Sequence, residues 1–236
     1  PSEETKGDGR SAIVFFFGGG WRSGSPTQFA EHCKYLASRG MVAMAADYRV
    51  SSRHGTKALQ CVADGKSAVR WIRANAKRLG VDASRVAAGG GSAGGHVAAC
   101  TGTIDGLDEE GEDLSVSSRP DCLVLFNPAV VLVPVGDSLP FPRDRMTDLM
   151  SRMGIESEKL SPYHHVSKGD PPTIVFHGTG DTTVPYRTAE LFAERMQEVG
   201  NTCRLVPFDG RSHGFFNYGR NGNGDFKATV RAMDEF

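Results

Sequence analysis

The sequence lacks the features that mark several specialised classes of protein. No run of apolar residues approaches the length of about 18 that a transmembrane helix requires, so we expect no such segment. No secretory signal peptide is visible. Lys and Arg number 27 against 28 Asp and Glu, a net charge of −1, so no basic field is available to bind nucleic acid. We expect a soluble protein, cytoplasmic or secreted, without a nucleic-acid partner; its oligomeric state is left open.

Cysteine is scarce and shows no pairing pattern. The five cysteines are an odd number, and none of them forms a C-x-x-C pair. All five lie among apolar or small residues, which favours buried free side chains over a disulfide framework or a metal site. His164 and His165 have no convincing third ligand, so we expect no bound metal. The five are Cys33, Cys61, Cys100, Cys122 and Cys203.

Glycine, by contrast, is abundant and clustered. The 236 residues include 29 glycines, with clusters at 18–20, 89–91 and 94–95. Clustered glycine marks tight turns, at which the backbone approaches another group closely. Hydrophobic residues make up 39% of the chain and charged residues 23%, which supplies a sizeable core and excludes wholesale disorder.

Apolar strands alternate with helices along the chain. The predicted strands are apolar throughout, which indicates a parallel sheet covered by helices on both faces. Ser25 and Gln28 mark one helix start, as N-cap and as the partner residue of a capping box. Ligands of such sheets bind beyond the carboxyl ends of the strands, so the residues after each strand are candidates for a site. Strands are expected at 13–17, 41–46, 85–89, 122–126, 173–177 and 204–208, and the longer helices at 26–39, 59–79, 93–100, 186–199 and from 226.

The strongest local motif is Gly90-Gly91-Ser92-Ala93-Gly94, which follows a predicted strand and precedes a helix. G-x-S-x-G in that context is a nucleophile elbow, a turn so tight that it pushes the serine hydroxyl into the open above the sheet. The same stretch also fits the dinucleotide fingerprint G-x-G-x-x-G. That alternative requires an acidic residue after a second strand about 20 residues on. An acidic loop at 105–113, without a strand pattern, follows instead, and we expect it to be a solvated surface loop.

Two further loops carry the groups that would activate Ser92. Asp181 comes just after the fifth predicted strand and His213 after the sixth, in the order Ser, Asp, His of the α/β-hydrolases. Asp209 is a rival acid, but it lies only four residues from His213 in the same loop. The three glycines at 18–20 follow the first strand and leave backbone N–H groups free to face a substrate carbonyl oxygen.

Together these motifs resemble those of serine esterases of the α/β-hydrolase superfamily. The similarity covers nearly the whole chain and is nearest to small carbohydrate-type esterases, acetyl or feruloyl, and to hormone-sensitive-lipase-like enzymes. The resemblance implies that Ser92 is the nucleophile and that Asp181 and His213 are its partners. The implied donors of the oxyanion hole are the amides of Gly18, Gly19, Gly20 and Ala93. The family patterns H-G-G-G-[WF], G-x-S-A-G-G, H-G-x-x-D and H-[GA]-F correspond here to residues 17–21, 90–95, 177–181 and 213–215.

The chain departs from that pattern at two places. Phe17 stands where the family has histidine, so the hydrogen bond with which that histidine braces the glycine loop is absent. Residues 47–49, Asp-Tyr-Arg, resemble the lipase-like group, but the N-terminal cap helices of that group have no counterpart. The two strands that normally open the fold are also missing, so we expect a chain that is trimmed at its ends.

We therefore expect residues 1–236 to form a single α/β-hydrolase catalytic domain, with a small lid or insertion at about 129–165. The expected reaction is hydrolysis of short-chain or small carboxylic esters through an acyl-enzyme on Ser92, without a cofactor. His213 is expected to take the serine proton and Asp181 to orient His213. Acyl groups on carbohydrates are a substrate class that only the resemblance implies. Trp21 and Phe215 adjoin the site motifs and are the expected walls of the substrate pocket.

Two alternatives remain open. The run Gly-Gly-x-Trp at residues 18–21 also resembles the H-G-G-x-W motif of kynurenine formamidases, which points to an amide as the substrate. The chain is otherwise a non-catalytic binding member of the fold, although an intact set of Ser92, Asp181 and His213 argues against that reading.

Overall fold

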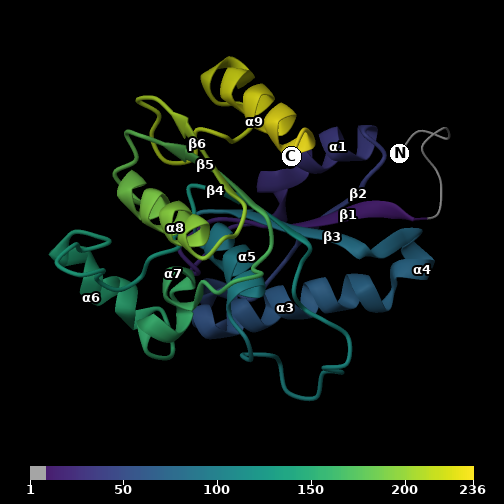
Figure 1. The fold of residues 1–236 in the computed structure, drawn as a ribbon, viewed down its shortest axis with the longest axis horizontal. Helices are drawn as coiled ribbons and strands as arrows, with labels where there is room; N and C mark the ends of the chain where they lie inside the picture. The colour runs from purple at the N-terminus through teal and green to yellow at the C-terminus, as the bar shows by residue number, and fades with distance from the viewer. Residues whose placement is uncertain (1–8) are drawn as a thin grey trace.

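Six parallel strands form the centre of the structure, a computed structural model that describes residues 9–236 (Figure 1). The strand order is β2-β1-β3-β4-β5-β6, and every neighbouring pair is parallel, as predicted. Residues 1–8, which the domain prediction includes, lie outside the described part. The strands are β1 (Arg10–Phe16), β2 (Val42–Ala46), β3 (Val81–Gly91), β4 (Cys122–Phe126), β5 (Thr173–Gly178) and β6 (Cys203–Phe208).

Helices cover both faces of this sheet, which explains why its strands are apolar throughout. On one face lie α3 (Ala58–Ala74), α5 (Ala93–Thr103) and α8 (Tyr186–Glu198), and on the other lie α1 (Ala30–Ser38) and α9 (Gly224–Asp234) (Figure 1). Successive residues of a strand therefore enter different cores: Phe15 packs with the α1–α9 side and Phe16 with the α3–α5 side. The shorter elements are η2 (Pro26–Phe29), α2 (Ser51–His54), α4 (Ala76–Leu79), α6 (Arg143–Ser151), η3 (Ser157–Leu160), α7 (Pro162–His165) and η4 (Asn221–Asn223).

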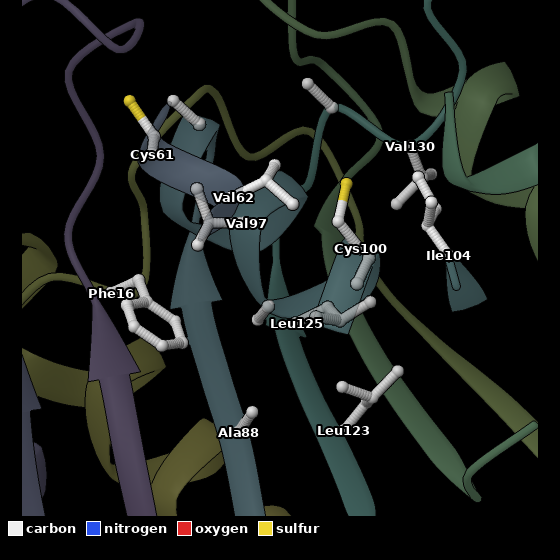
Figure 2. Packing of buried hydrophobic residues seen from close by; sticks show 14 of the residues in the cluster. Phe16, Cys61, Val62, Ala88, Val97, Cys100, Ile104, Leu123, Leu125 and Val130 are labelled. Atoms are coloured by element: carbon white, nitrogen blue, oxygen red, sulfur yellow. The ribbon is translucent and has the colours of Figure 1, made fainter. Parts of the chain in front are cut away.

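The larger core lies between the sheet and helices α3 and α5. Figure 2 shows Phe16 and Leu125 of the strands in the same core as Val62 of α3 and Val97 of α5. Two cysteines, Cys61 and Cys100, belong to this core and act as small apolar side chains. All five cysteines are free; Cys203 is also buried, and the other two are partly buried.

The order of the strands determines where a ligand can reach the backbone. From β1 the chain moves to β2 at one edge, and then returns to add β3, β4, β5 and β6 on the other side of β1. The direction of winding therefore reverses between β1 and β3. Parallel sheets open a crevice at such a reversal, at the carboxyl ends of the two strands. Gly18 to Gly20 follow β1 and Ser92 follows β3, so both segments meet at this crevice.

Three local details differ from the sequence-based expectations. The helix expected over 59–79 is interrupted at Asn75, whose side-chain amide donates to Trp71 O and separates α3 from α4. The acidic loop at 105–113 is only partly solvated, because Arg70 forms ion pairs with Asp108 and Glu112. The helix expected from residue 26 begins with one 3-10 turn, η2. Among the helices of residues 9–236, none is both long and apolar enough to cross a membrane.

Candidate active site

Ser92 sits at the turn between β3 and α5 in a conformation that few side chains adopt. Its φ is 56° and its ψ is −118°. A Cβ added to Gly90 would lie 2.3 Å from Gly94 O, and one added to Gly94 would lie 2.0 Å from Phe16 O. Both positions must therefore be glycine for the turn to close this tightly. The result is a serine held in strained backbone at the carboxyl edge of the sheet, as the elbow motif predicts.

A chain of hydrogen bonds joins Ser92 to His213 and Asp181. His213 Nε2 lies 2.9 Å from Ser92 Oγ, and His213 Nδ1 lies 2.7 Å from Asp181 Oδ2. The His213 side chain is 25% exposed, whereas the Asp181 carboxylate is fully buried. The rival acid, Asp209, is exposed and accepts a hydrogen bond from Thr179 Oγ1 at 3.2 Å instead.

Asp181 is held as an anion by several donors. Its Oδ1 accepts the amides of Thr183 and Val184, at 2.8 and 3.0 Å. Its Oδ2 accepts Asn127 Nδ2 at 2.5 Å and also faces His177 Nε2 at 3.4 Å. Burial raises the pKa of this carboxyl group, but the hydrogen bonds from the two histidines and from the backbone outweigh burial and hold the pKa below its ordinary range.

Sequence reasoning missed the roles of Asn127 and His177 around this carboxylate. The positions of both residues, at the ends of predicted strands, could have indicated these roles. Asn127 directly follows β4, with a φ of 42°, and His177 is the next-to-last residue of β5. Each therefore ends a strand at the same edge of the sheet as Ser92. A fixed carboxylate accepts a hydrogen bond from the N–H of His213 Nδ1, which leaves the lone pair of Nε2 to face the Ser92 hydroxyl.

The glycine loop after β1 passes directly over Ser92. A Cβ on Gly18 would lie 3.3 Å from Ser92 Cβ. The structure nonetheless removes Gly18 from the expected oxyanion-hole donors, because its N–H already donates to Gln28 Oε1 at 2.6 Å. Within residues 9–236, the amides of Gly19, Gly20 and Ala93 form no hydrogen bond with protein. These three N–H groups are the ones free to bind an oxyanion beside Ser92.

Gln28 also has a different role from the one that its sequence position predicts. Ser25 does cap η2, since its Oγ accepts from Thr27 N at 3.3 Å, but Gln28 forms no capping box. The Gln28 side chain instead turns inward and also donates from Nε2 to Asn217 Oδ1 at 2.9 Å. It therefore connects the glycine loop to the loop that carries His213. No local sequence pattern reports this contact, because 189 positions separate Gln28 from Asn217.

Phe17, which replaces the family's histidine, is buried and stacks on Tyr48 with ring centroids 4.2 Å apart. The Tyr48 hydroxyl donates to Phe17 O at 2.6 Å. Burial raises the pKa of this phenol, so it remains a donor. The beginning of the glycine loop is thus braced by Tyr48 from one side and by Gln28 from the other.

A cavity of about 520 Å³ opens beside Ser92 and His213. Trp21 lines it. Phe215 does not: it is 1% exposed and packs on Phe208 in the core below, and its neighbour Phe216 reaches the cavity wall instead. Consecutive residues of this turn point in different directions, so the wall residue is Phe216 and the prediction of Phe215 was wrong by one position. The remaining apolar side chains of the wall are those of Ala93, Ala129, Phe141, Leu149 and Val184.

His96 fixes the orientation of Trp21. The indole Nε1 donates to His96 Nδ1 at 3.1 Å, and His96 Nε2 lies 2.7 Å from Leu160 O. Burial lowers the pKa of His96 to about 4, although its bond to Leu160 opposes the effect. The ring is therefore neutral, with its proton on Nε2. Within residues 9–236, no three His, Cys, Asp or Glu side chains gather to hold a metal ion.

Comparison with solved structures gives close matches over the whole fold. Esterase 2 of Thermogutta terrifontis, in a form phosphonylated by sarin, is 54% identical, with a TM-score of 0.94 over 97% of this chain and 83% of that one. The propionate-bound form of the same esterase is 53% identical, with a TM-score of 0.92 over 100% of this chain and 85% of that one. The α/β-hydrolase fold is therefore confirmed.

Curated proteins that resemble the chain are longer than it is. Esterase LipC of Mycobacterium tuberculosis is 29% identical over 86% of this chain and 52% of its own length. A probable isoprenylcysteine alpha-carbonyl methylesterase, ICMEL1 of Arabidopsis thaliana, is 24% identical over 86% of this chain and 45% of its own length. The chain thus spans about half the length of these relatives. The BD-FAE family profile matches residues 2–196, and the chain therefore belongs to the BD-FAE family of esterases with the α/β-hydrolase fold.

Proposed function

We propose that the protein hydrolyses carboxylic esters by transferring the acyl group to Ser92 and then to water. One observation carries the proposal: a serine, a histidine and a buried carboxylate are joined at 2.9 and 2.7 Å, beside three amides that have no hydrogen-bond partner in the described part of the chain. The esterases that resemble this chain support the same chemistry.

In the proposed reaction, His213 carries out each proton transfer. His213 Nε2 takes the proton of Ser92 Oγ as the oxygen attacks the ester carbonyl carbon, and Asp181 stabilises the imidazolium that forms. The carbonyl oxygen becomes an oxyanion, which the amides of Gly19, Gly20 and Ala93 bind. His213 then gives its proton to the leaving alcohol, and in the second half it activates the water that releases the acid.

The cavity supports small esters as substrates. Trp21 and Phe141 line the same cavity as Ser92, and Trp21 cannot turn away easily because His96 holds its indole. We propose that residues 129–165, which include α6 and α7, act as a small lid over a single catalytic domain. Leu149 of α6 forms part of the cavity wall. Acyl groups on carbohydrates remain a proposal that rests on family resemblance.

Amide hydrolysis is the second candidate. It is favoured by the similarity to an acylamino-acid-releasing enzyme of Arabidopsis thaliana, which is 25% identical over 90% of this chain and 29% of its own length. The same nucleophile and oxyanion site serve both reactions. The difference lies in the leaving group, since an amine must be protonated by His213 before it departs.

The test is a matched pair of substrates, 4-nitrophenyl butyrate and butyryl 4-nitroanilide, with Ser92→Ala and a control variant, Ser115→Ala. Ser115 is exposed and lies just beyond the acidic loop. We expect Ser92→Ala to lower kcat on the ester by about 10³-fold or more at an unchanged melting temperature, and Ser115→Ala to be neutral. Turnover close to wild type in folded Ser92→Ala would contradict the proposal, and a higher kcat/KM for the anilide would favour the amide.

A further inference from the structure

The charged side chains of the catalytic cavity are all of one sign. Arg22, Arg152 and Arg220 line it, and among its lining residues, all within 9–236, there is no aspartate or glutamate. The chain as a whole has a net charge of −1, so this bias is local to the cavity. A cleft lined by one sign of charge attracts ligands of the other sign.

Two of these arginines share one carboxylate. Asp148 of α6 forms ion pairs with both Arg22 and Arg152. One negative charge cannot neutralise two guanidinium groups, so this side of the cavity keeps an excess of one positive charge. Arg22 follows the glycine loop and Arg152 is the C-cap of α6, so the excess lies where the proposed lid meets the oxyanion site.

Of the three arginines, Arg152 is the best placed to contact a ligand beside the glycine loop. A Cβ added to Gly20 would lie 2.8 Å from Arg152 Nη1, so the guanidinium rests against the glycine loop. Its Nε is buried and has no hydrogen-bond partner among the described residues. The backbone around it is fixed, because Arg152 O accepts Ala58 N at 2.9 Å and ties the end of α6 to the start of α3.

Arg220 contributes a second positive charge, from the loop that carries His213. Within residues 9–236 it has no ion pair, and its Nη1 makes only a long contact, 3.4 Å, with His213 O. It lines both the catalytic cavity and a smaller hollow beside Gln28 and Asn217. The positive charges therefore lie on two sides of the cavity. Arg152 belongs to the proposed lid, and Arg220 belongs to the loop that carries His213.

From this arrangement we propose that the preferred substrate is an ester that carries a carboxylate away from the scissile bond, which Arg152 and Arg220 bind. A guanidinium presents parallel N–H donors that match the two oxygens of a carboxylate. This inference rests on the proposed ester hydrolysis at Ser92. The carboxylate can belong to the acid or to the alcohol portion of the ester, and the experiment separates the two.

The experiment compares kcat/KM for two pairs of esters that match in shape and differ in charge. Monomethyl succinate against methyl 4-oxopentanoate places the carboxylate on the acid side. 4-Acetoxybenzoate against 4-acetoxybenzamide places it on the alcohol side. Rates are divided by those of alkaline hydrolysis, so that the leaving groups do not bias the comparison. The variants are Arg152→Gln and Arg220→Gln, with Arg78→Gln as a control for net charge, since Arg78 is exposed on α4 beyond the opposite end of β3.

We expect the anionic ester to be preferred about fivefold or more in one of the pairs, and the preference to weaken as salt is raised to about 1 M. Arg152→Gln and Arg220→Gln should each lower the ratio of anionic to neutral kcat/KM by about three- to tenfold, and Arg78→Gln by less than about twofold. A neutral preference in both pairs, or a ratio that survives both arginine variants, would overturn the inference. Failure of the wild type to hydrolyse even 4-nitrophenyl butyrate would instead refute the proposed function, and this inference with it.

Discussion

The contact between Gln28 and Gly18 leads to a quantitative prediction about a residue that no catalytic motif includes. Gln28→Met keeps the length of the side chain and removes both hydrogen bonds, the one from Gly18 N at 2.6 Å and the one to Asn217 at 2.9 Å. Gly18 N lies in a partly buried position, and an N–H that loses its acceptor away from water costs about 1–3 kcal/mol. The loop can avoid that cost only by moving, and Gly19 and Gly20 then move with it.

The expected effect on catalysis follows from those numbers. Because 1.36 kcal/mol is a factor of ten, a cost of about 1–3 kcal/mol corresponds to about 5- to 160-fold. We expect kcat/KM to fall within the lower part of this range, by about 5- to 100-fold, mainly through kcat. The loss stays below the roughly 10²–10³-fold effect of deleting a whole oxyanion donor, since the amides themselves remain. A displaced oxyanion hole weakens binding of the transition state more than binding of the ester, so KM should change little.

The assay is steady-state hydrolysis of 4-nitrophenyl butyrate with urea unfolding of the same samples. Gln197→Met is the matched control, because Gln197 Nε2 donates to Cys203 O at 2.8 Å at a site outside the cavity lining. Both variants should lose some stability, and only Gln28→Met should lose turnover. The proposal that Gln28 holds the glycine loop in place is refuted if Gln28→Met keeps kcat/KM within about twofold of wild type, or if Gln197→Met loses as much activity.

Three further predictions concern the acid, the buried histidine and the acyl chain. Asp181→Asn should lower kcat by about 10³- to 10⁴-fold and Asp209→Asn by less than about threefold; the reverse order would reassign the acid. Burial lowers the pKa of His32 to about 3, so as pH falls below about 6.5 the unfolded chain binds a proton that the folded one refuses, and stability drops. His32→Phe should therefore be about 2 kcal/mol less sensitive than wild type to a change from pH 7 to 5, by urea unfolding; an equal loss would refute the buried neutral ring. With 4-nitrophenyl esters, kcat/KM should peak between acetyl and butyryl and fall at least about tenfold by octanoyl, and a peak at ten carbons or beyond would exclude the small-ester proposal.

Most of the fold could be predicted because its signals are local. Each strand is a short apolar run, and all six appear within a few residues of the expected positions, with β4 at the expected bounds. The elbow was also predictable, because Gly90 and Gly94 are required by contacts inside one turn. His213 and Asp181 could be anticipated from their positions after β6 and β5, since parallel strands end at one edge of the sheet.

One part that escaped prediction depends on contacts between distant segments, and another depends on the geometry of a single turn. Gln28 has the spacing of a capping-box residue, and only the approach of Gly18 and Asn217 turns its amide inward. Phe215 and Phe216 are equivalent in sequence, and the turn at Gly214, with a φ of 75°, decides which of them faces the cavity. Periodicity and motif spacing carry no information about either choice.

The central claim, that Ser92 is the nucleophile of an ester hydrolase, is tested most directly by covalent labelling. The protein is treated with a fluorophosphonate, and intact mass, peptide mapping and residual hydrolysis of 4-nitrophenyl butyrate are followed on the same samples. We predict one adduct per chain, on the peptide that contains Ser92, with activity lost in proportion to the labelled fraction and no labelling of Ser92→Ala. Labelling at another residue, or full activity in a sample whose Ser92 is completely modified, would contradict the claim.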